Sequence, residues 1–517
     1  MVARKVFRDA VHDMIILHRI DQGPDCAPVD WGDALLLDLI DTLPMQRLRR
    51  IRQLGPAAKI YPSAEHSRFS HSLGTLHLAK RMITQAIQGG FTGLEPVELL
   101  AIKVSALFHD IGHGPHSHAF EHIFPDLPNH EAWGWRILSE PGLPRTLLER
   151  HGHRLGLAMD RFMDALRDIW QPSGTCASER LSGRPFISSQ LDADRMDYLL
   201  RDAHCTGVSY GRFDLEWLLH SLNVQPVDGR LRLCVDLGKG PAALESYIFA
   251  RDHMYRQVYD HKTVRAFETL LVHIFGLIDW IWTLEGAPPP ETPPPLVTFL
   301  TSARQGRDPG VEAFLALDDT VVDYALGRWA SMEPRTAVQG ELRQRCRMFC
   351  HRQSIYRRLR WNMPTGGEDQ GQLSFGFTPF PGGVALDPTL RAAPQATDLI
   401  HDPQLVERVE RFFRDHDEDM IATPQEDGGY LNVPLRLLAR VDRIQRAPYS
   451  HLQYDPLGAD PVYVITQEGT VRPAEQVSPL VHFLGQSRRR LARVFVDPRV
   501  TDQVRALALE GLSPWLA

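Results

Sequence analysis

The chain has 517 residues, of which 43% are hydrophobic and 23% are charged, and its formal net charge at pH 7 is −7. These proportions are ordinary for a folded soluble protein. The negative charge argues against general, charge-driven binding to nucleic acid, although it is compatible with a local basic pocket for phosphates. The start, MVARKVFRDAVHDM, lacks the apolar core of a secretory signal, and the most apolar stretch, 270–282, is too short to span a bilayer. We therefore expect a cytoplasmic protein that does not enter a membrane.

Length alone favours about three folded units, but the pattern of apolar residues favours one large helical domain with insertions. An extended arm is expected at 11–20, VHDMIILHRI. In 43–55, apolar residues recur at three-residue steps up to Gly55, and 97–114 is continuously apolar until Gly112 breaks it. The predicted helices cover residues 43–55, 71–87, 97–114, 129–138, 191–208 and 245–282.

Two changes of composition follow the helical part. GAPPPETPPP at 286–295 favours extended polyproline conformation, and the Gly- and Pro-rich segment 366–388 favours a loop or lid. Beyond it, 461–478 and 488–498 have the composition of strands and a hairpin. The sequence therefore predicts a mainly α fold. Its parts would be a helical core over 1–285, a Pro-rich linker over 286–300 and a smaller α+β C-terminal region over 301–517.

The six cysteines are scattered along the chain without a CxxC pair. In a cytoplasmic protein they are most simply free thiols. Cys346 and Cys350 lie one helical turn apart, but two thiolates alone make a poor zinc site.

The stretch FHDIGHGPHSH at 108–118 carries four histidines and one aspartate. Neutral imidazole is the commonest metal ligand in proteins. His109 and Asp110 are neighbours near a helix end, while His71 and Asp194 lie on two other predicted helices. If the four side chains converge, they offer two nitrogen and two oxygen ligands, which suit Mn, Fe, Ni, Co, Zn or Mg. Two positions of an octahedral ion would remain for water and a substrate phosphate, as a metal-assisted hydrolase requires.

The flanks of these residues make the pattern more specific. SRFSHSLG (67–74) and FHDIGHGPHSHAFE (108–121) resemble the motifs of HD-domain phosphohydrolases, and more closely those of the deoxynucleoside triphosphate triphosphohydrolase branch, which includes dGTPase-like enzymes. The resemblance covers about 6–285 and is weak beyond 300. It implies an HD-domain catalytic core over 1–285 and a C-terminal region used in oligomerisation or regulation. Further similar blocks are RLRRIRQLG at 47–55, SSQLDADRMDYLLRDAHCTGVSYGRFD at 188–214 and ARDHMYRQVYDHK at 250–262.

The resemblance implies a role for each matching residue. His130 would be the catalytic histidine, with Glu131 beside it to orient the ring, and His113 and His118 would face the scissile α-phosphate. The implied metal ligands are His71, His109, Asp110 and Asp194. The implied triphosphate ligands are Arg68, Arg195, Arg251 and Lys262, and the sugar and base would contact Gln53, Tyr198, Asp202 and Tyr259.

These implied roles agree with the chemistry of the substrate. A triphosphate carries about four negative charges, and guanidinium groups bind phosphate oxygens with paired hydrogen bonds. A tyrosine packed on the deoxyribose would exclude a 2′-hydroxyl. The expected reaction is hydrolysis of a deoxynucleoside triphosphate to a deoxynucleoside and intact triphosphate, with His130 as the proton-transfer group.

Plainer interpretations stay open for several residues. Arg195 could equally pair with acidic residues of its own helix, and for Arg201 we favour such a structural pair. Tyr198 and Tyr259 could be core residues, and His113 and His118 could cap the broken helix end. The residues expected to be solvated are His116, His122, Arg47, Arg49, Arg50, Arg52 and Arg488–Arg490.

Alternative functions follow from the breadth of the HD superfamily. One is a nucleotide monophosphatase or phosphodiesterase, in which His113 and His130 would help to bind a second metal. Another is a catalytically silent nucleotide sensor. The basic block at 250–262 favours the triphosphatase, because a monophosphate needs fewer positive charges. The expected partners are a deoxynucleotide substrate, a nucleotide effector and further copies of the chain, while no nucleic-acid partner is expected.

Overall fold

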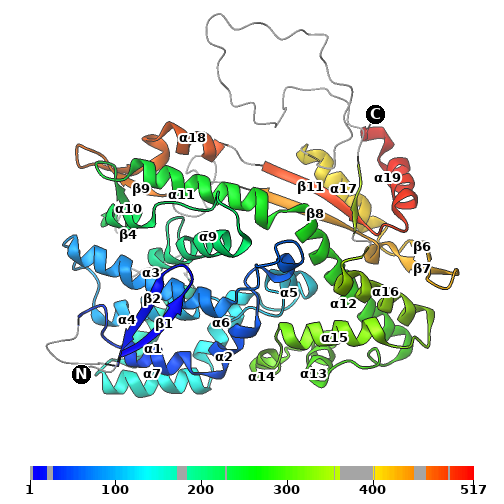
Figure 1. Cartoon of the computed structure of the whole chain (residues 1–517), viewed down its shortest axis with the longest axis horizontal. Helices are drawn as coiled ribbons and strands as arrows, with labels where there is room; N and C mark the ends of the chain where they lie inside the picture. The colour runs from blue at the N-terminus through cyan, green and yellow to red at the C-terminus, as the bar shows by residue number, and fades with distance from the viewer. Residues whose placement is uncertain are drawn as a thin grey trace, which may run out of the picture. The chain divides into compact units, whose positions relative to one another are not determined.

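The computed structural model describes residues 4–19, 27–171, 183–227, 230–353, 356–360, 400, 402–446, 461–486 and 489–516. The chain divides into two compact units, one of Met1–Gln353 with Ala447–Arg488 and one of Ser354–Arg446 with Arg489–Ala517. Helices predominate and the sheets are small, as Figure 1 shows, so the predicted mainly α fold is confirmed. The segment 366–388, predicted to be a loop or lid, lies outside the described residues.

The first unit begins with an antiparallel hairpin of β1 (Arg4–Asp9) and β2 (Asp13–His18). Its turn is held by the Asp9 carboxylate, which accepts hydrogen bonds from the backbone N–H groups of Val11 (2.9 Å) and His12 (3.0 Å). Such a local side-chain acceptor is typical of tight turns. The extended arm expected at 11–20 is therefore one strand of this hairpin.

The centre of the first unit is α3 (Arg68–Gln88), which packs against α4 (Pro96–Phe108) and α9 (Ala193–Thr206). The apolar residues expected on one face of α3, such as Leu76 and Met82, are buried. At the start of α4, the Glu95 and Glu98 side chains form a reciprocal capping box. Helical periodicity therefore located these helices, but the helix expected over 97–114 already ends at Phe108, before Gly112.

The apolar spacing predicted a single helix over 43–55, but the structure divides this stretch. α2 (Leu43–Arg47) passes into a 3₁₀ turn, and Ile51 is extended. Arg47 is fully buried and donates to the backbone carbonyls of Leu317 (2.6 Å) and His113 (2.9 Å). Contacts with distant segments therefore override the local preference, and the expectation that Arg47 is solvated was wrong. Arg49 and Arg50 are exposed, as expected, and Arg50 also pairs with Asp318. Arg52 is half-buried and forms ion pairs with Glu65, Asp319 and Asp323.

Four helices follow the Pro-rich stretch within the first unit. The expectation of extended polyproline was wrong from Pro294 onward, because proline is well tolerated at the first helical position and begins α13 there. The Pro-rich stretch 286–300 therefore does not separate the compact units. The functional division into a catalytic core at 1–285 and a regulatory region at 301–517 stays a prediction. The helices are α13 (Pro294–Arg304), α14 (Gly310–Leu315), α15 (Asp319–Ser331) and α16 (Ala337–His351).

Helix α12 (Lys262–Glu285) is longer than the apolar stretch 270–282 that it contains. Among the described helices it alone is long and apolar enough to cross a membrane by composition, and 56% of its most apolar window is buried. It packs against α16 and α5 (His118–Ile123), which is the behaviour of a core helix. Before it, α11 (Pro241–Met254) ends in a π-helical turn, Tyr255–Tyr259, so the long helical stretch expected at 245–282 is divided.

The sheet of the first unit joins distant parts of the chain. Its order is β10-β9-β4-β3, and β9 runs parallel to β4. The strands expected near 461–478 are thus present, but they belong to the first unit. The strands are β3 (Leu222–Val227), β4 (Arg230–Asp236), β9 (Tyr463–Ile465) and β10 (Val471–Pro473), followed by α18 (Pro479–Gln486).

The second unit is the α+β part. Its central sheet has the order β5-β11-β8 with antiparallel pairing, and α17 (Pro403–Asp415) packs against β8 and β11. The strand expected near 488–498 is β11. The remaining bounds are β5 (Arg357–Arg358), β6 (Met420–Pro424), β7 (Tyr430–Pro434), β8 (Ala439–Arg446), β11 (Arg489–Val496) and α19 (Thr501–Leu516).

Candidate metal centre and active site

Four side chains from three helices converge at the centre of the first unit. His71 lies in the first turn of α3, His109 and Asp110 follow directly after α4, and Asp194 lies in the first turn of α9. The Nε2 atoms of His71 and His109 are 3.1 Å apart, and Asp194 Oδ1 is 3.0 Å and 3.4 Å from them. Asp110 oxygens lie 3.6 Å from His71 Nε2 and 3.5 Å from His109 Nε2. The convergence expected from the sequence is therefore present.

The second nitrogen of each imidazole explains why these residues fit a metal ion. His71 Nδ1 lies 2.7 Å from the Asp197 carboxylate, and His109 Nδ1 lies 2.9 Å from the Ala106 carbonyl. Both acceptors favour a proton on Nδ1, which leaves the two Nε2 lone pairs facing the same point. The two nitrogens can lie 3.1 Å apart because one of them holds a proton, and a divalent ion would take the place of that proton. The residues thus fit a divalent ion bound by two nitrogens and two carboxylates.

The electrostatics of the cluster favour a cation. Burial lowers the pKa of His71, but Asp194 and Asp197 outweigh it and raise this pKa to about 10. Burial raises the pKa of Asp110, but Arg68, His109 and His113 hold it well below its usual range. The carboxylates are therefore ionised and can serve as anionic ligands of a cation.

Arg68, expected to bind the triphosphate, is committed to contacts within the protein. It is buried, and its Nη1 donates to Asp110 Oδ2 at 2.5 Å. Its Nε donates to Ser117 Oγ (2.8 Å) and its Nη2 to the Gln53 carbonyl (3.3 Å). In this structure, Arg68 orients Asp110, a candidate metal ligand.

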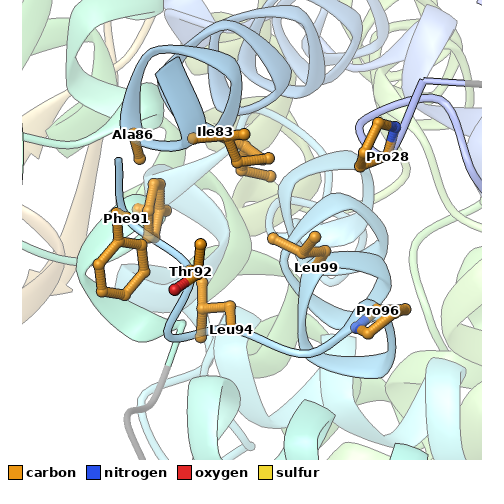
Figure 2. A pocket seen from close by; sticks show the side chains of 10 residues that line it. Pro28, Ile83, Ala86, Phe91, Thr92, Leu94, Pro96 and Leu99 are labelled. Atoms are coloured by element: carbon orange, nitrogen blue, oxygen red, sulfur yellow. The ribbon is translucent and has the colours of Figure 1, made fainter. Parts of the chain in front are cut away.

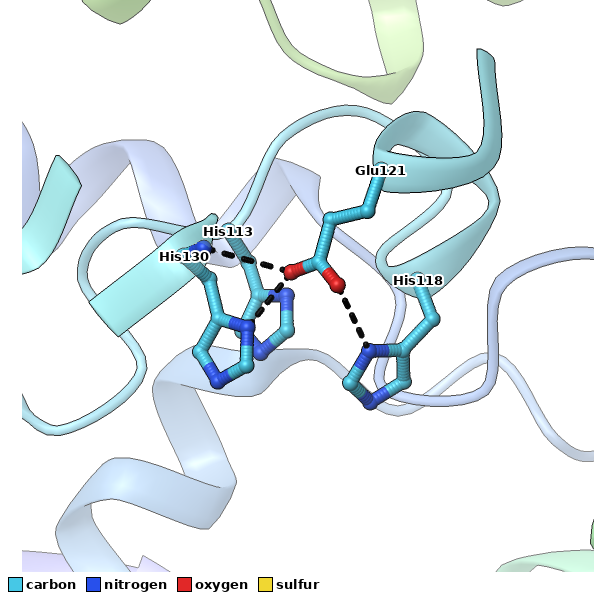
Figure 3. Close-up of side chains that lie close together, drawn as sticks. All are labelled: His113, His118, Glu121 and His130. Atoms are coloured by element: carbon cyan, nitrogen blue, oxygen red, sulfur yellow. Dashed lines mark hydrogen bonds and ion pairs between the residues drawn. The ribbon is translucent and has the colours of Figure 1, made fainter. Parts of the chain in front are cut away.

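A second cluster consists of His113, His118, Glu121 and His130, shown in Figure 3. The rings of His113 and His130 stack with their centroids 4.0 Å apart. His130 Nδ1 lies 2.5 Å from Glu121 Oε1, and His118 Nδ1 lies 3.7 Å from Glu121 Oε2. His113 Nε2 lies 3.3 Å from Asp110 Oδ1, so this cluster adjoins the metal cluster.

The residue that orients His130 is Glu121 on α5, and the expectation for Glu131 was wrong. Glu131 follows His130 in α6 (His130–Ser139) and is exposed. Consecutive helix residues do not face each other, so Glu131 cannot easily reach the ring. Burial raises the pKa of Glu121, but His118 and His130 outweigh it and lower this pKa strongly, so Glu121 is a carboxylate.

The turn at His116 and Ser117, between His113 and His118 of the second cluster, has an unusual backbone conformation. His116 and Ser117 both have positive φ, 57° and 59°, a conformation that residues with a side chain adopt only when neighbouring contacts hold it. The His116 N–H donates to Asp319 Oδ1 (2.7 Å), and Ser117 Oγ donates to the Arg52 carbonyl (2.6 Å). The His116 ring is buried with Nε2 3.2 Å from Asp323, so the expectation that it is solvated was wrong. His122, in contrast, is exposed.

The other basic residues expected at the triphosphate differ in their partners. Arg195 pairs with Asp192 at 2.8 Å, which is the structural alternative left open above. Arg201 pairs with Asp197 and Asp9, so the structural interpretation of Arg201 is confirmed. Among the described residues, neither Arg251 nor Lys262 has an acidic partner, and Arg251 Nε is buried without a hydrogen bond. These two cations remain available to an anionic ligand.

Tyrosines and an aspartate gather on the α9 side of the metal cluster. The His71 and Tyr198 ring centroids are 6.4 Å apart, and those of Tyr198 and Tyr259 are 6.0 Å apart. Asp202 accepts hydrogen bonds from Tyr259 OH (2.8 Å) and His66 Nε2 (2.7 Å). Four residues near the clusters were not identified from the sequence: His66, Glu121, Asp197 and Tyr255.

Two further features lie apart from these clusters. His18, Asp30 and Asp33 are close enough to hold an ion, but Lys80 Nζ already lies 2.9 Å from Asp30 and 2.6 Å from Asp33. A hollow of about 230 Å³ lies between α3 and α4 (Figure 2). Its lining is mostly apolar and contains no residue of either cluster; it includes Pro28, Ile83, Ala86, Phe91, Leu94 and Leu99.

The four described cysteines, Cys205, Cys234, Cys346 and Cys350, are free thiols, as expected.

Comparison with known proteins agrees with this geometry. Residues 68–202 match the model of the HD domain family. The uncharacterized protein YwfO of Bacillus subtilis is 33% identical over 353 residues, which are 68% of this chain and 70% of YwfO. The deoxynucleoside triphosphate triphosphohydrolase SAMHD1 of Danio rerio is 30% identical over 295 residues, 52% of this chain but only 44% of that protein.

A solved structure supports the fold. The crystal structure of a phosphohydrolase from Bacteroides thetaiotaomicron matches with a TM-score of 0.64 at 23% identity and covers 96% of this chain and 100% of that one. Since 70% of YwfO aligns with this chain at 33% identity, and since the matched HD model contains all four residues of the candidate metal cluster, the chain belongs to the HD domain family.

Proposed function

We propose that this protein is a metal-dependent hydrolase that converts deoxynucleoside triphosphates to deoxynucleosides and inorganic triphosphate. The observation that carries the proposal is the contact between the two clusters, in which His113 lies 3.3 Å from Asp110 and stacks on His130. A metal centre and a carboxylate-oriented histidine side by side suit hydrolysis of a phosphate ester. The similarity to SAMHD1, named a deoxynucleoside triphosphate triphosphohydrolase, supports this choice of substrate.

The chemistry assigns a task to each group. His71, His109, Asp110 and Asp194 would hold a divalent ion, which would supply Lewis-acid stabilisation of phosphate charge. A water oxygen attacks the α-phosphorus, the bond from phosphorus to O5′ breaks, and O5′ takes a proton. Since Glu121 engages His130 Nδ1, the Nε2 atom of His130 is the one that takes the water proton or protonates O5′.

The triphosphate needs positive charge that the protein does not already neutralise. Arg251 and Lys262 have no acidic partner in the described parts of the chain, whereas Arg68 and Arg195 do. We therefore assign the main triphosphate contacts to Arg251 and Lys262. His118, with a side chain 61% exposed beside His113, is suited to an α-phosphate contact.

The tyrosines are suited to the deoxyribose and base. Asp202 accepts a hydrogen bond from the Tyr259 hydroxyl, and the Tyr198 ring lies near the rings of both Tyr259 and His71. A ring in that position can exclude a 2′-hydroxyl by contact. Gln53, whose side-chain Oε1 is buried without a partner, is available to a donor on the sugar.

Other properties are proposed with this function. A cytoplasmic location would give access to deoxynucleotides, and a homo-oligomer with a nucleotide effector would match the regulation expected of the C-terminal region. The alternatives are another HD phosphohydrolase, which would act on a monophosphate or diester, and a nucleotide sensor without turnover.

A product assay distinguishes these functions. Purified protein is incubated with each dNTP and rNTP, singly and mixed, with Mg²⁺, Mn²⁺, Co²⁺ or Ni²⁺, and the products are separated by chromatography. Deoxynucleoside with intact triphosphate, lost in Asp110→Ala, is expected. Phosphate or diphosphate release would favour another HD hydrolase, and absence of turnover with metal bound would favour the sensor.

A further inference from the structure

We propose that the N-terminal β1–β2 hairpin is a positioning element for the metal centre, which orients the ligand His71 through the buried carboxylate of Asp197. The inference rests on the proposed metal centre. It concerns residues far apart in sequence: Asp197 lies 126 positions from His71 and 185 positions from His12.

The first step is the environment of Asp197, whose side chain is fully buried. Its Oδ2 lies 2.7 Å from His71 Nδ1 and accepts from Arg201 Nε at 2.8 Å. Its Oδ1 lies 2.6 Å from His12 Nε2 and accepts from Arg201 Nη2 at 3.0 Å. Each oxygen thus receives one imidazole and one guanidinium contact. Because both lone-pair sets are used, the carboxylate has one orientation.

The second step is a closed ring of hydrogen bonds that returns to the hairpin. Arg201 donates from Nη1 to Asp9 Oδ2 (2.9 Å) and from Nη2 to Asp9 Oδ1 (3.2 Å). Asp9 in turn accepts the backbone N–H of His12, and His12 contacts Asp197. The hairpin turn, α9 and the first turn of α3 are therefore held by one circuit of charge-assisted bonds.

The third step is the packing around the circuit. A Cβ atom on Gly74, one turn along α3 from His71, would lie 1.8 Å from Asp197 Oδ1 and 2.4 Å from Arg201 Nη2. Only glycine permits so close an approach of the carboxylate to α3. The side chains of His12 and Arg201 are also almost completely buried, 1% and 2% exposed. The contact is thus a built feature of the interior.

The consequence concerns metal affinity. A carboxylate hydrogen-bonded to the far nitrogen of a histidine ligand fixes its tautomer and ring orientation, and loss of such a partner typically costs about 10–100-fold in metal affinity. If His12 no longer holds Asp197, His71 loses part of this orientation although every ligand atom is still present.

The test is the dissociation constant for Mn²⁺ measured by titration calorimetry of the full chain. His12→Phe fills the same space without a donor, and we expect it to weaken Mn²⁺ binding about 10–100-fold. His12→Gln keeps a donor of similar reach and should restore affinity to within a few-fold. Arg8→Ala, a change at an exposed position on β1 of the same hairpin, is the matched control and should bind as the wild type does.

Thermal unfolding of each metal-free variant shows whether it is folded at the titration temperature. A folded His12→Phe variant with wild-type affinity for Mn²⁺ would overturn the inference and leave the metal centre intact. The inference would also be overturned if His12→Gln weakened Mn²⁺ binding as much as His12→Phe does. A wild-type protein that binds no Mn²⁺ or other divalent ion would overturn the proposed metal centre itself, and the inference with it.

Discussion

Glu121 and His130 are joined by a contact of 2.5 Å between Oε1 and Nδ1, and the His130 backbone N–H donates to the same oxygen at 3.2 Å. The carboxylate therefore fixes the orientation of the ring and leaves Nε2 as the atom that can transfer a proton.

We predict that Glu121→Gln lowers kcat by roughly 10²–10⁴, the range associated with a positioned acid–base group. His130→Ala should give a loss at least as large, without unfolding the protein. Steady-state kinetics measure kcat for both variants, and their affinity for Mn²⁺ should be the same as that of the wild type. Glu131→Gln is the matched control and should remain near wild-type activity. A greater loss in Glu131→Gln than in Glu121→Gln would reverse the assignment.

A metal ion should stabilise the first unit through the His71–His109–Asp110–Asp194 cluster. At a free ion concentration 100 times Kd, binding to the folded state alone adds about 2.7 kcal/mol to the free energy of unfolding. Asp194→Asn removes one anionic ligand at a partly exposed position, so the melting-temperature increase with Mn²⁺ should be largely lost. His153→Ala, at an exposed site, should keep it. If Mn²⁺ raised the melting temperature of Asp194→Asn as much as that of the wild type, the ion would bind elsewhere.

Arg251 and Arg195 should respond differently to removal. A charge-assisted hydrogen bond is worth about 1.5–3 kcal/mol, so Arg251→Ala should lower kcat/KM for the triphosphate by roughly 10–150-fold. Arg195→Ala should instead lower stability, because Asp192 is buried and its pKa is already raised to about 6, by burial first and by Asp194. Kinetics and thermal unfolding of both variants separate the two effects. If kcat/KM fell more in Arg195→Ala than in Arg251→Ala, the phosphate contact would be assigned to Arg195 and not to Arg251.

His66 should make stability depend on pH. Burial lowers the pKa of His66, but Asp202 and Cys205 outweigh it and raise this pKa to about 9. Because the folded pKa lies above the ordinary value near 6.5, the stabilisation is fully present below about pH 6.5 and is lost as the pH rises through 9. Urea unfolding at pH 6, 7.5 and 9 should show this loss in the wild type, and a smaller one in His66→Gln. Equal pH dependence in both proteins would exclude His66 as the cause.

The sequence was sufficient for the parts that depend on local pattern or on short motifs. The sequence pattern located α3 and α9 to within a few residues, and three separate motifs, around His71, His109 and Asp194, identified the four residues of the candidate metal cluster. The roles of these residues came from resemblance, and the convergence of their side chains is consistent with it.

The residues that were missed depend on contacts between distant segments. Arg47 and His116 were expected to be solvated, but their partners Leu317 and Asp319 lie 270 and 203 residues further along the chain. Glu121 was missed because adjacency in sequence favoured Glu131, although neighbours on a helix point in different directions. A local sequence pattern does not show which distant segment will pack over a given residue.

The parallel pairing of β9 with β4 has a consequence for synthesis of the chain. Val235 pairs with Val464, and residues 354–446 between them belong to the other unit. At about 5–20 residues per second, the ribosome needs on the order of ten to fifty seconds to make β9 after β4 has emerged. During that time the β4 edge is unpaired, and an open strand edge can pair with other chains. A gene cut after codon 353 would make this delay permanent, so recombinant production of the first unit should include residues 447–488.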